Sequence, residues 1–347
     1  MTYILIYLTG ISLSFYLLYF ITNYYFIPAL DKISSKFNIS SDIAGSTLMA
    51  AGSSAPELAI MLFAIFKVGG HGAIGVGTIV GSALFNLFFI IGAVILIKQS
   101  KLVWQPLIRD LSFYAISIAL LFYFFKDGSI NLTESIILVA VYIFYVLIMF
   151  LWKKLFPYVD NEQQLQPEKE ESTEQNTNKI DAFLISIIPT SSYILIAFTI
   201  SIILICFLSW ILVNSVVNIS QALNISELFI GLTLMAVGTS IPDLFSSIIV
   251  AKKGRTGMAI NNAIGSNIFD FLIGMGLPFM IYAIYYGQSV LIDSKHLAVS
   301  YVLLFSSIII LLISLVIAKW RTTKFIGVLL FILYFLYLVF TSQDLLK

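Results

Sequence analysis

The chain has 347 residues, of which 60% are apolar and only 11% charged, with a mean hydropathy of +1.00 and a net charge of +1. Soluble domains carry about 25% charged residues, so this composition excludes a soluble protein. The near-neutral charge gives no basis for nucleic-acid binding. The single cysteine, Cys206, excludes a disulfide within the chain, and the two histidines, His71 and His296, lack metal-ligand spacing.

Ten apolar stretches of the chain are long enough to cross a bilayer, which takes roughly 20 residues of helix. In chain order they are residues 3–26, 43–66, 72–97, 108–125, 133–152, 182–213, 227–250, 257–285, 297–318 and 324–342. The first lacks a basic leader and a small-residue cleavage site, so we predict a retained span. The predicted fold class is an all-α polytopic membrane protein with ten transmembrane helices.

Lysine and arginine alternate between the two sides of this predicted bundle. With the N-terminus outside, all but four of the 19 basic residues fall inside; the four are Lys67, Lys126, Lys295 and Lys347. Basic residues favour the cytoplasmic side, so we predict a plasma-membrane protein with both termini outside. The polar stretch 153–179 has a disordered composition and is predicted to be a cytoplasmic linker, too short for a regulatory domain.

The chain repeats itself across that linker. Residues 38–57 align without gaps on residues 224–243, and eleven of the twenty positions are identical. A second block follows, Gly-Ser-Ala-Leu-Phe-Asn at 81–86 and Gly-Ser-Asn-Ile-Phe-Asp at 265–270. Chance recurrence of small residues does not explain two polar blocks in the same order. Each half, 1–152 and 180–347, has five predicted spans, so we predict two inverted-topology repeats, as in many secondary transporters.

Three acidic side chains lie inside the predicted spans and away from their ends: Glu57, Asp243 and Asp270. Each costs a few kcal/mol at the centre of a membrane helix. No lysine or arginine is predicted at that depth, so a bound cation or a proton must supply the compensating charge. Neutral acids that only hold helices together are the alternative, but they do not explain why Glu57 and Asp243 occupy equivalent repeat positions.

The neighbours of these acids predict a site made of oxygen atoms. Pro56 and Pro242 have no N–H, so we expect the helices to break near Gly52–Ser53 and near Gly238–Thr239 and to free backbone carbonyls. Further candidate oxygens belong to Ser53, Ser54, Ser82, Thr239, Ser240, Ser266, Asn86 and Asn262. Such a set suits Ca²⁺ or Na⁺ rather than softer metals. Small residues let helices approach closely, and this role is expected for Gly75, Gly77, Gly81 and Gly265.

These motifs resemble the two alpha-repeats of the cation/calcium exchanger superfamily, and among its members the potassium-dependent sodium/calcium exchangers most. The first alpha motif is residues 45–92, with Ala-Ala-Gly-Ser-Ser-Ala-Pro-Glu at 50–57. The second is residues 231–276, with Ala-Val-Gly-Thr-Ser-Ile-Pro-Asp at 236–243. The resemblance implies an antiporter that exchanges Ca²⁺ for Na⁺ by alternating access, with or without K⁺, and without a cofactor. The large hydrophilic regions of animal members are missing, so no calcium-sensor domain is expected.

The resemblance also implies a role for each candidate residue. Glu57 and Asp243 would be the central Ca²⁺ ligands, completed by the backbone carbonyls of Ser53 and Thr239. Flanking Na⁺ sites would be formed with Ser54, Ser82, Ser240 and Ser266, and the residues across from the two acids would be Asn86 and Asp270. An acid at the position of Asp270 is tied to K⁺ use in one branch and is held protonated in others, so K⁺ coupling stays open.

Three other functions are alternatives to this one. A Ca²⁺/H⁺ exchanger of the same fold would use protons in place of Na⁺, whereas the flanking serines favour Na⁺. An intramembrane aspartyl protease built on Asp243 and Asp270 would need two acids that share a proton, and it leaves Glu57 unexplained. A channel is disfavoured because inverted repeats with broken helices are typical of alternating access. We therefore predict a transporter and not an enzyme.

Overall fold

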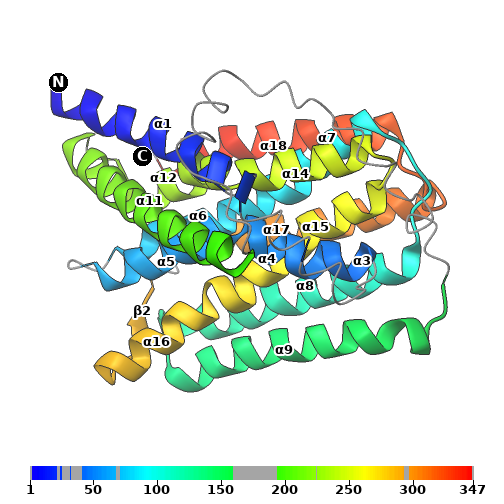
Figure 1. The fold of residues 1–347 in the computed structure, drawn as a ribbon, viewed down its shortest axis with the longest axis horizontal. Coiled ribbons are helices and arrows are strands. Elements are labelled where there is room, and N and C mark those ends of the chain that lie inside the picture. Colours follow the sequence, from blue (N-terminus) through cyan, green and yellow to red (C-terminus); the bar gives the residue numbers. More distant parts are fainter. Residues whose placement is uncertain are drawn as a thin grey trace.

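The computed structural model describes residues 2–21, 24–25, 32, 41–67, 71–158, 194–223, 225–292 and 297–345. Most of the predicted linker and the start of the predicted span 182–213 lie outside these residues. The helices pack into one bundle, with α1 and α11 together on one flank and α9 at the opposite edge (Figure 1).

The elements follow the predicted spans closely. Up to residue 158 they are α1 (Thr2–Ile21), α3 (Ser41–Ala44), η2 (Gly45–Met49), α4 (Ala50–Ser53), α5 (Ala55–Phe66), α6 (Gly72–Leu84), η3 (Phe85–Ile90), α7 (Ile91–Ile97), α8 (Trp104–Phe124), η4 (Phe125–Asp127), β1 (Ser129–Ile130) and α9 (Leu132–Leu155). From residue 194 they are α11 (Ile194–Leu223), α12 (Glu227–Ile230), η5 (Gly231–Met235), α13 (Ala236–Thr239), α14 (Ile241–Lys252), α15 (Thr256–Phe269), η6 (Asp270–Gly274), α16 (Gly276–Tyr286), β2 (Val290–Leu291), α17 (Leu297–Ile317) and α18 (Lys324–Leu345).

The described residues include eight helices that are long and apolar enough to cross a membrane. A bent pair, Gly45–Ser53 with Ala55–Phe66, makes a ninth if it is counted as one span, and Tyr7–Ile21 is a shorter apolar helix. Large apolar side chains such as Phe144, Leu147 and Phe150 on α9 face outward and are more than half exposed. The chain is therefore a multi-pass membrane protein, as predicted.

The sixth predicted span, 182–213, is wrong at its C-terminal end, because α11 continues to Leu223. The polar residues after residue 213 were interpreted as a loop. In the structure the Asn214 side chain donates to the carbonyl oxygen of Trp210 at 2.9 Å, and Asn218 donates to that of Asn214 at 2.7 Å. Amides that bond the preceding turn in this way let a helix carry them without ending.

Four π-helical turns recur at matched places in the two parts of the chain. Two of them, η2 and η5, start at Gly45 and Gly231, which are equivalent in the repeat alignment. The other two, η3 and η6, contain Asn86 and Asp270. Single π turns are rare in proteins, and those that occur often lie at functional sites. Irregular backbone therefore surrounds both repeated blocks.

Two glycines bring the broken spans against the neighbouring helices. A Cβ on Gly265 of α15 would lie 2.6 Å from the carbonyl oxygen of Ser46, and one on Gly81 of α6 would lie 2.4 Å from that of Leu232. These distances are shorter than any real Cβ contact. The close-packing role predicted for Gly81 and Gly265 is confirmed, and the two contacts are equivalent under the repeat.

Two backbone pairings between loops, which we call the clasps, join the two parts of the chain. The first is the antiparallel pair of β1 with β2. The second is the Lys101–Arg321 bridge, where Leu102 N–H donates to Trp320 at 2.8 Å. The first clasp follows the end of α8 and the second precedes its start. Since α8 has 21 residues and spans about 31 Å, the clasps lie at opposite ends of the bundle.

Candidate functional site

Glu57 and Asp243 each lie in the first turn of a helix that begins after a break. The first break is at Ser54, with φ −87° and ψ 6°, and α4 and α5 meet there at 50°. The second is at Ser240, with φ −84° and ψ 4°. Both breaks come one residue later than predicted, and each proline follows within the first helical turn, where a missing N–H is tolerated. Both carboxylates are fully buried.

Each carboxylate is bonded by a residue from the other half. Ser240 Oγ lies 3.3 Å from Glu57 Oε1 and 2.9 Å from Ser82 Oγ. Asn86 Nδ2 donates to Asp243 Oδ2 at 3.2 Å, and Ser266 Oγ donates to Asp243 Oδ1 at 3.0 Å. The structure thus brings both acids and these four partners together at one buried place between the halves.

The hydroxyl residue just before each break also contacts the acid of the opposite half. Ser53 interacts with the Asp243 carboxylate, and Thr239 interacts with the Glu57 carboxylate. Both hydroxyls also bond their own helix: Ser53 Oγ donates to the Met49 carbonyl at 2.8 Å, and Thr239 Oγ1 to the Met235 carbonyl at 3.0 Å. The geometry therefore has the approximate two-fold relation expected of repeated halves.

Five buried oxygens at this place have no hydrogen-bond partner within the described part of the chain. They are Ser54 Oγ, Glu57 Oε2, Asn86 Oδ1 and both carboxylate oxygens of Asp270. Asp270 is fully buried and close enough to Glu57 and Asp243 for electrostatic interaction. Buried acceptors without donors are costly unless a cation or a proton satisfies them. This chemistry fits a hard cation, which binds carboxylate, amide and hydroxyl oxygens.

The comparisons with known proteins agree with this chemistry. Residues 7–151 and 193–343 match the family described as sodium/calcium exchanger protein. The chain belongs to the sodium/calcium exchanger family. Sodium/potassium/calcium exchanger 1 of Gallus gallus is 26% identical over 97% of this chain and 78% of its own length. Sodium/potassium/calcium exchanger 4 of Homo sapiens is 26% identical over 97% of this chain and 81% of its own length.

Two solved structures of exchangers share the fold. The crystal structure of the H⁺/Ca²⁺ exchanger CAX has a TM-score of 0.70 at 16% identity and covers 96% of this chain and 82% of its own. The sodium-calcium exchanger NCX_Mj, soaked with Na⁺ and Sr²⁺, has a TM-score of 0.61 at 23% identity and covers 97% of this chain and 98% of its own. At these identities the likeness shows the fold of this family member and no more.

Two predicted site residues make no regular hydrogen bond to a site acid among the described residues. Asn262 donates to Ser247 Oγ at 3.0 Å, and no hydrogen bond from it to an acid is present among the described residues. Ser54 lies beside Asp270 without regular hydrogen-bond geometry. Within the described residues, no three acidic, histidine or cysteine side chains gather closely enough to hold a metal by themselves. A cation site here would need neutral oxygens as well as carboxylates.

Sequence reasoning missed two residues beside the acids. Asn267 accepts from Asn86 Nδ2 at 3.0 Å and donates to the Ala83 carbonyl at 3.0 Å, so it fixes the amide that bonds Asp243. Tyr114 of α8 interacts with both Asn267 and Asp270. The block Gly-Ser-Asn at 265–267, set against Gly-Ser-Ala in the first half, was the available signal for Asn267.

The assignment of Arg109 to an inside loop is wrong. The fourth span was predicted to start at residue 108, which left Arg109 at its end. α8 starts at Trp104 instead, which places Arg109 and Asp110 in its second turn, both fully buried. Arg109 Nε donates to Asp110 Oδ1 at 2.7 Å. The pair is a second buried ionic centre, and Arg109 pairs with Asp110 and not with the site acids.

Proposed function

We propose that this protein is a secondary antiporter that exchanges Ca²⁺ for Na⁺ by alternating access. One observation carries the proposal: two fully buried carboxylates, each bonded from the opposite half, lie with a third buried acid among acceptor oxygens that lack donors. Such a site stabilises a cation between two halves of a bundle. Membership of the exchanger family and the similarity to sodium/potassium/calcium exchangers support the same function.

In this proposal Glu57 and Asp243 are the central Ca²⁺ ligands. The backbone carbonyls of Ser53 and Thr239 complete the site. Each of these residues is the last of its helix, directly before the break, where a carbonyl can turn toward a bound ion. The Na⁺ ions bind at flanking positions with Ser54, Ser82, Ser240 and Ser266. No cofactor and no enzymatic step take part, since transport needs only the binding and release of ions.

We propose ten membrane-spanning helices in two inverted halves, joined by a cytoplasmic linker at 153–179. The clasps support the inversion, because one joins the loop after α8 to the loop after α16, and the other joins the loop after α17 to the loop after α7. These loops exchange with each other under the repeat and lie at opposite ends of α8. We place both termini outside the plasma membrane, because the basic residues gather in the loops on the other, cytoplasmic side.

A second candidate, exchange of Ca²⁺ for H⁺, is favoured by one observation. Asp270 is buried with both oxygens unbonded by the described residues, and proton uptake would satisfy it as well as K⁺ would. The first half has Asn86 at the equivalent place, so only one of the two equivalent positions can titrate in this way. Whether Asp270 binds K⁺ or a proton therefore decides between coupling to K⁺ and coupling to H⁺.

Transport in proteoliposomes tests these proposals. We expect Ca²⁺ uptake into vesicles loaded with Na⁺, and we expect it to stop when the Na⁺ gradient is removed. Repeating the assay with and without K⁺ assigns K⁺ co-transport. Uptake that ignores Na⁺ but follows an imposed pH gradient would reject Na⁺ coupling and favour the second candidate.

A further inference from the structure

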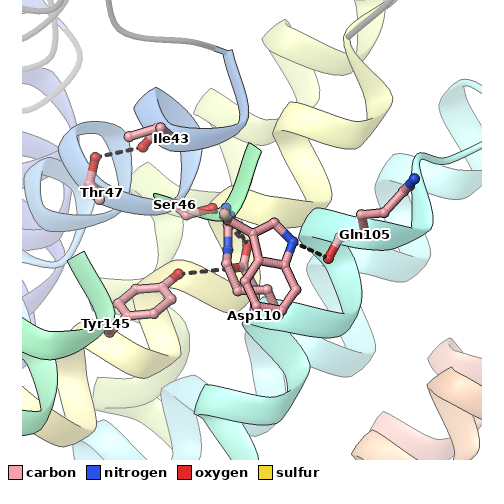
Figure 2. Close-up of polar contacts among 8 residues, drawn as sticks. Ile43, Ser46, Thr47, Gln105, Asp110 and Tyr145 are labelled. Atoms are coloured by element: carbon pink, nitrogen blue, oxygen red, sulfur yellow. Dashed lines mark hydrogen bonds and ion pairs between the residues drawn. The ribbon is translucent and has the colours of Figure 1, made fainter. Parts of the chain in front are cut away.

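The buried pair of Arg109 and Asp110 lies apart from the proposed ion site and has no role in it so far. Asp110 is fully buried and receives hydrogen bonds from three different elements. Arg109 donates to both of its oxygens, at 2.7 and 3.2 Å. Tyr145 of α9 donates to Oδ1 at 3.0 Å, and Ser46 of η2 donates to Oδ2 at 2.8 Å. Figure 2 shows Ser46 and Tyr145 approaching Asp110 from two sides.

Asp110 belongs to a firmly held part of the bundle. Trp152 Nε1 donates to the Gln105 carbonyl at 3.1 Å, so α9 is bonded to α8 at Gln105 as well as at Asp110 (Figure 2). The clasps fix both ends of α8. Asp110 is therefore an anchor whose place is set by its surroundings without any help from Ser46.

Ser46 belongs to the broken span that carries Glu57. Its hydroxyl bonds the anchor, while its backbone lies against Gly265 of α15, where a Cβ would be 2.6 Å from its carbonyl oxygen. The residue after Gly265 is Ser266, which donates to Asp243. Ser46 thus connects the anchor to the span of one site acid and to the helix that bonds the other.

The second half has no such ionic contact at the equivalent position. Leu232 replaces Ser46 there, and it is held by its carbonyl, which accepts from Tyr337 at 3.2 Å. The ionic anchor is therefore an asymmetry between the halves, as Asp270 is. An element that only stabilised the repeat fold would be expected in both halves.

We propose that Asp110, held by Arg109, is a positioning residue that sets the Glu57 span through the Ser46 hydroxyl. We call Ser46, Arg109 and Asp110 the latch. The inference rests on the proposed ion-exchange function, because it assigns to the latch a role in Ca²⁺ affinity. Loss of this single hydrogen bond to a charged group loosens the span without unfolding the protein.

The test uses two variants, each of which removes one hydroxyl that donates a hydrogen bond to Asp110. Ser46→Ala removes the bond to the ion-site span, and Tyr145→Phe removes a bond of similar length to α9, which carries no predicted site residue. We expect Ser46→Ala to raise the KM for Ca²⁺ about three- to tenfold with a smaller change in maximal rate. We expect Tyr145→Phe to keep the wild-type KM. Both variants retain the Arg109 bonds and so should fold.

Thermal unfolding in detergent separates positioning from general stability. A purely structural role predicts equal losses of Tm and no difference in KM between the two variants, and that result would overturn the proposal. Asp110→Asn serves as a third variant, expected to raise the KM at least as much as Ser46→Ala where it folds. If the wild-type protein shows no Na⁺-dependent uptake, the proposed function fails; if it does and the two KM values match, only the latch fails.

Discussion

At the residue scale, the site acids differ in how their oxygens are satisfied. Asp243 has a donor on each oxygen, Glu57 has a donor on one, and Asp270 has none among the described residues. Fewer donors leave more of the burial cost to a bound cation or proton. The three acids therefore need different amounts of compensation from a bound cation or proton, although they are near enough to interact electrostatically.

The first prediction concerns the two repeat-equivalent acids. Glu57→Gln and Asp243→Asn keep the shape of the side chain but remove one negative charge from the cation, and Asp243→Asn also replaces one of two accepting oxygens by an amide donor. Breaking a buried charge pair costs about 3–5 kcal/mol, so Ca²⁺ uptake should fall about 100-fold or more. Asp127→Asn is the control, because it makes the same change at an exposed turn. Near-normal flux in Glu57→Gln would show that the site is wrongly placed.

The second prediction concerns Asp270. Asp270→Asn should remove the dependence of uptake on K⁺ or on pH and should leave Ca²⁺ selectivity over other divalent cations nearly unchanged. The reason is that Asp270 has no bonded partner to lose and has an amide, Asn86, as its repeat equivalent. Uptake is measured against K⁺ at fixed pH and against pH at fixed K⁺. A loss of Ca²⁺ transport as large as that of Glu57→Gln would instead place Asp270 in the Ca²⁺ site.

The placement of the site acids could be predicted from the sequence because charge is rare in apolar spans and two of the acids recur in the repeat. Arg109 and Asp110 were missed because the span was predicted to start at residue 108, which left both at its end, whereas α8 begins four residues earlier at Trp104. Asn262 was predicted as a site residue from composition, and only packing shows that its amide turns to Ser247.

At the element scale, the broken spans are pressed against helices that bring the second polar block. η2 meets α15 at Gly265, and η5 meets α6 at Gly81. These contacts set the depth at which Glu57 and Asp243 enter the site. The sequence predicts helix positions from apolar runs, but it does not indicate which helices touch, because that depends on side-chain fit between distant segments.

The third prediction tests this close packing. Gly81→Ala and Gly265→Ala insert a methyl group within 2.4 and 2.6 Å of a backbone oxygen, which cannot move away like a side chain. Overpacking costs about 1–3 kcal/mol, so we expect a lower Tm in detergent and reduced uptake for both. Gly72→Ala is the matched control, because nothing lies within 4 Å of its Cβ. Equal Tm values for the three variants would contradict the packing argument.

At the scale of the whole molecule, the proposed halves face opposite sides of the membrane. Odd span number and basic loops predict this from sequence, and the clasps at opposite ends of α8 are what an inverted pair requires. What sequence could not indicate is how the halves are joined, since clasp strands of two residues have no recognisable pattern.

The fourth prediction tests orientation by labelling. Lys126→Cys and Gln99→Cys, each made with Cys206→Ala, add one exposed thiol beyond either end of α8. A membrane-impermeant maleimide should label Lys126→Cys in intact cells and Gln99→Cys only after permeabilisation. The opposite pattern would reverse the proposed orientation, and labelling of both from one side would exclude α8 as a span.

The clasps also bear on how much the covalent connection between the halves matters. Each half meets the other through backbone pairing at both ends of the bundle and through hydrogen bonds across the buried acids. None of these contacts involves residues 159–179. A chain cut within that stretch and produced as two co-expressed fragments should therefore reassemble into a working exchanger, which makes the linker a tether and the site itself the recognition surface between two polypeptides.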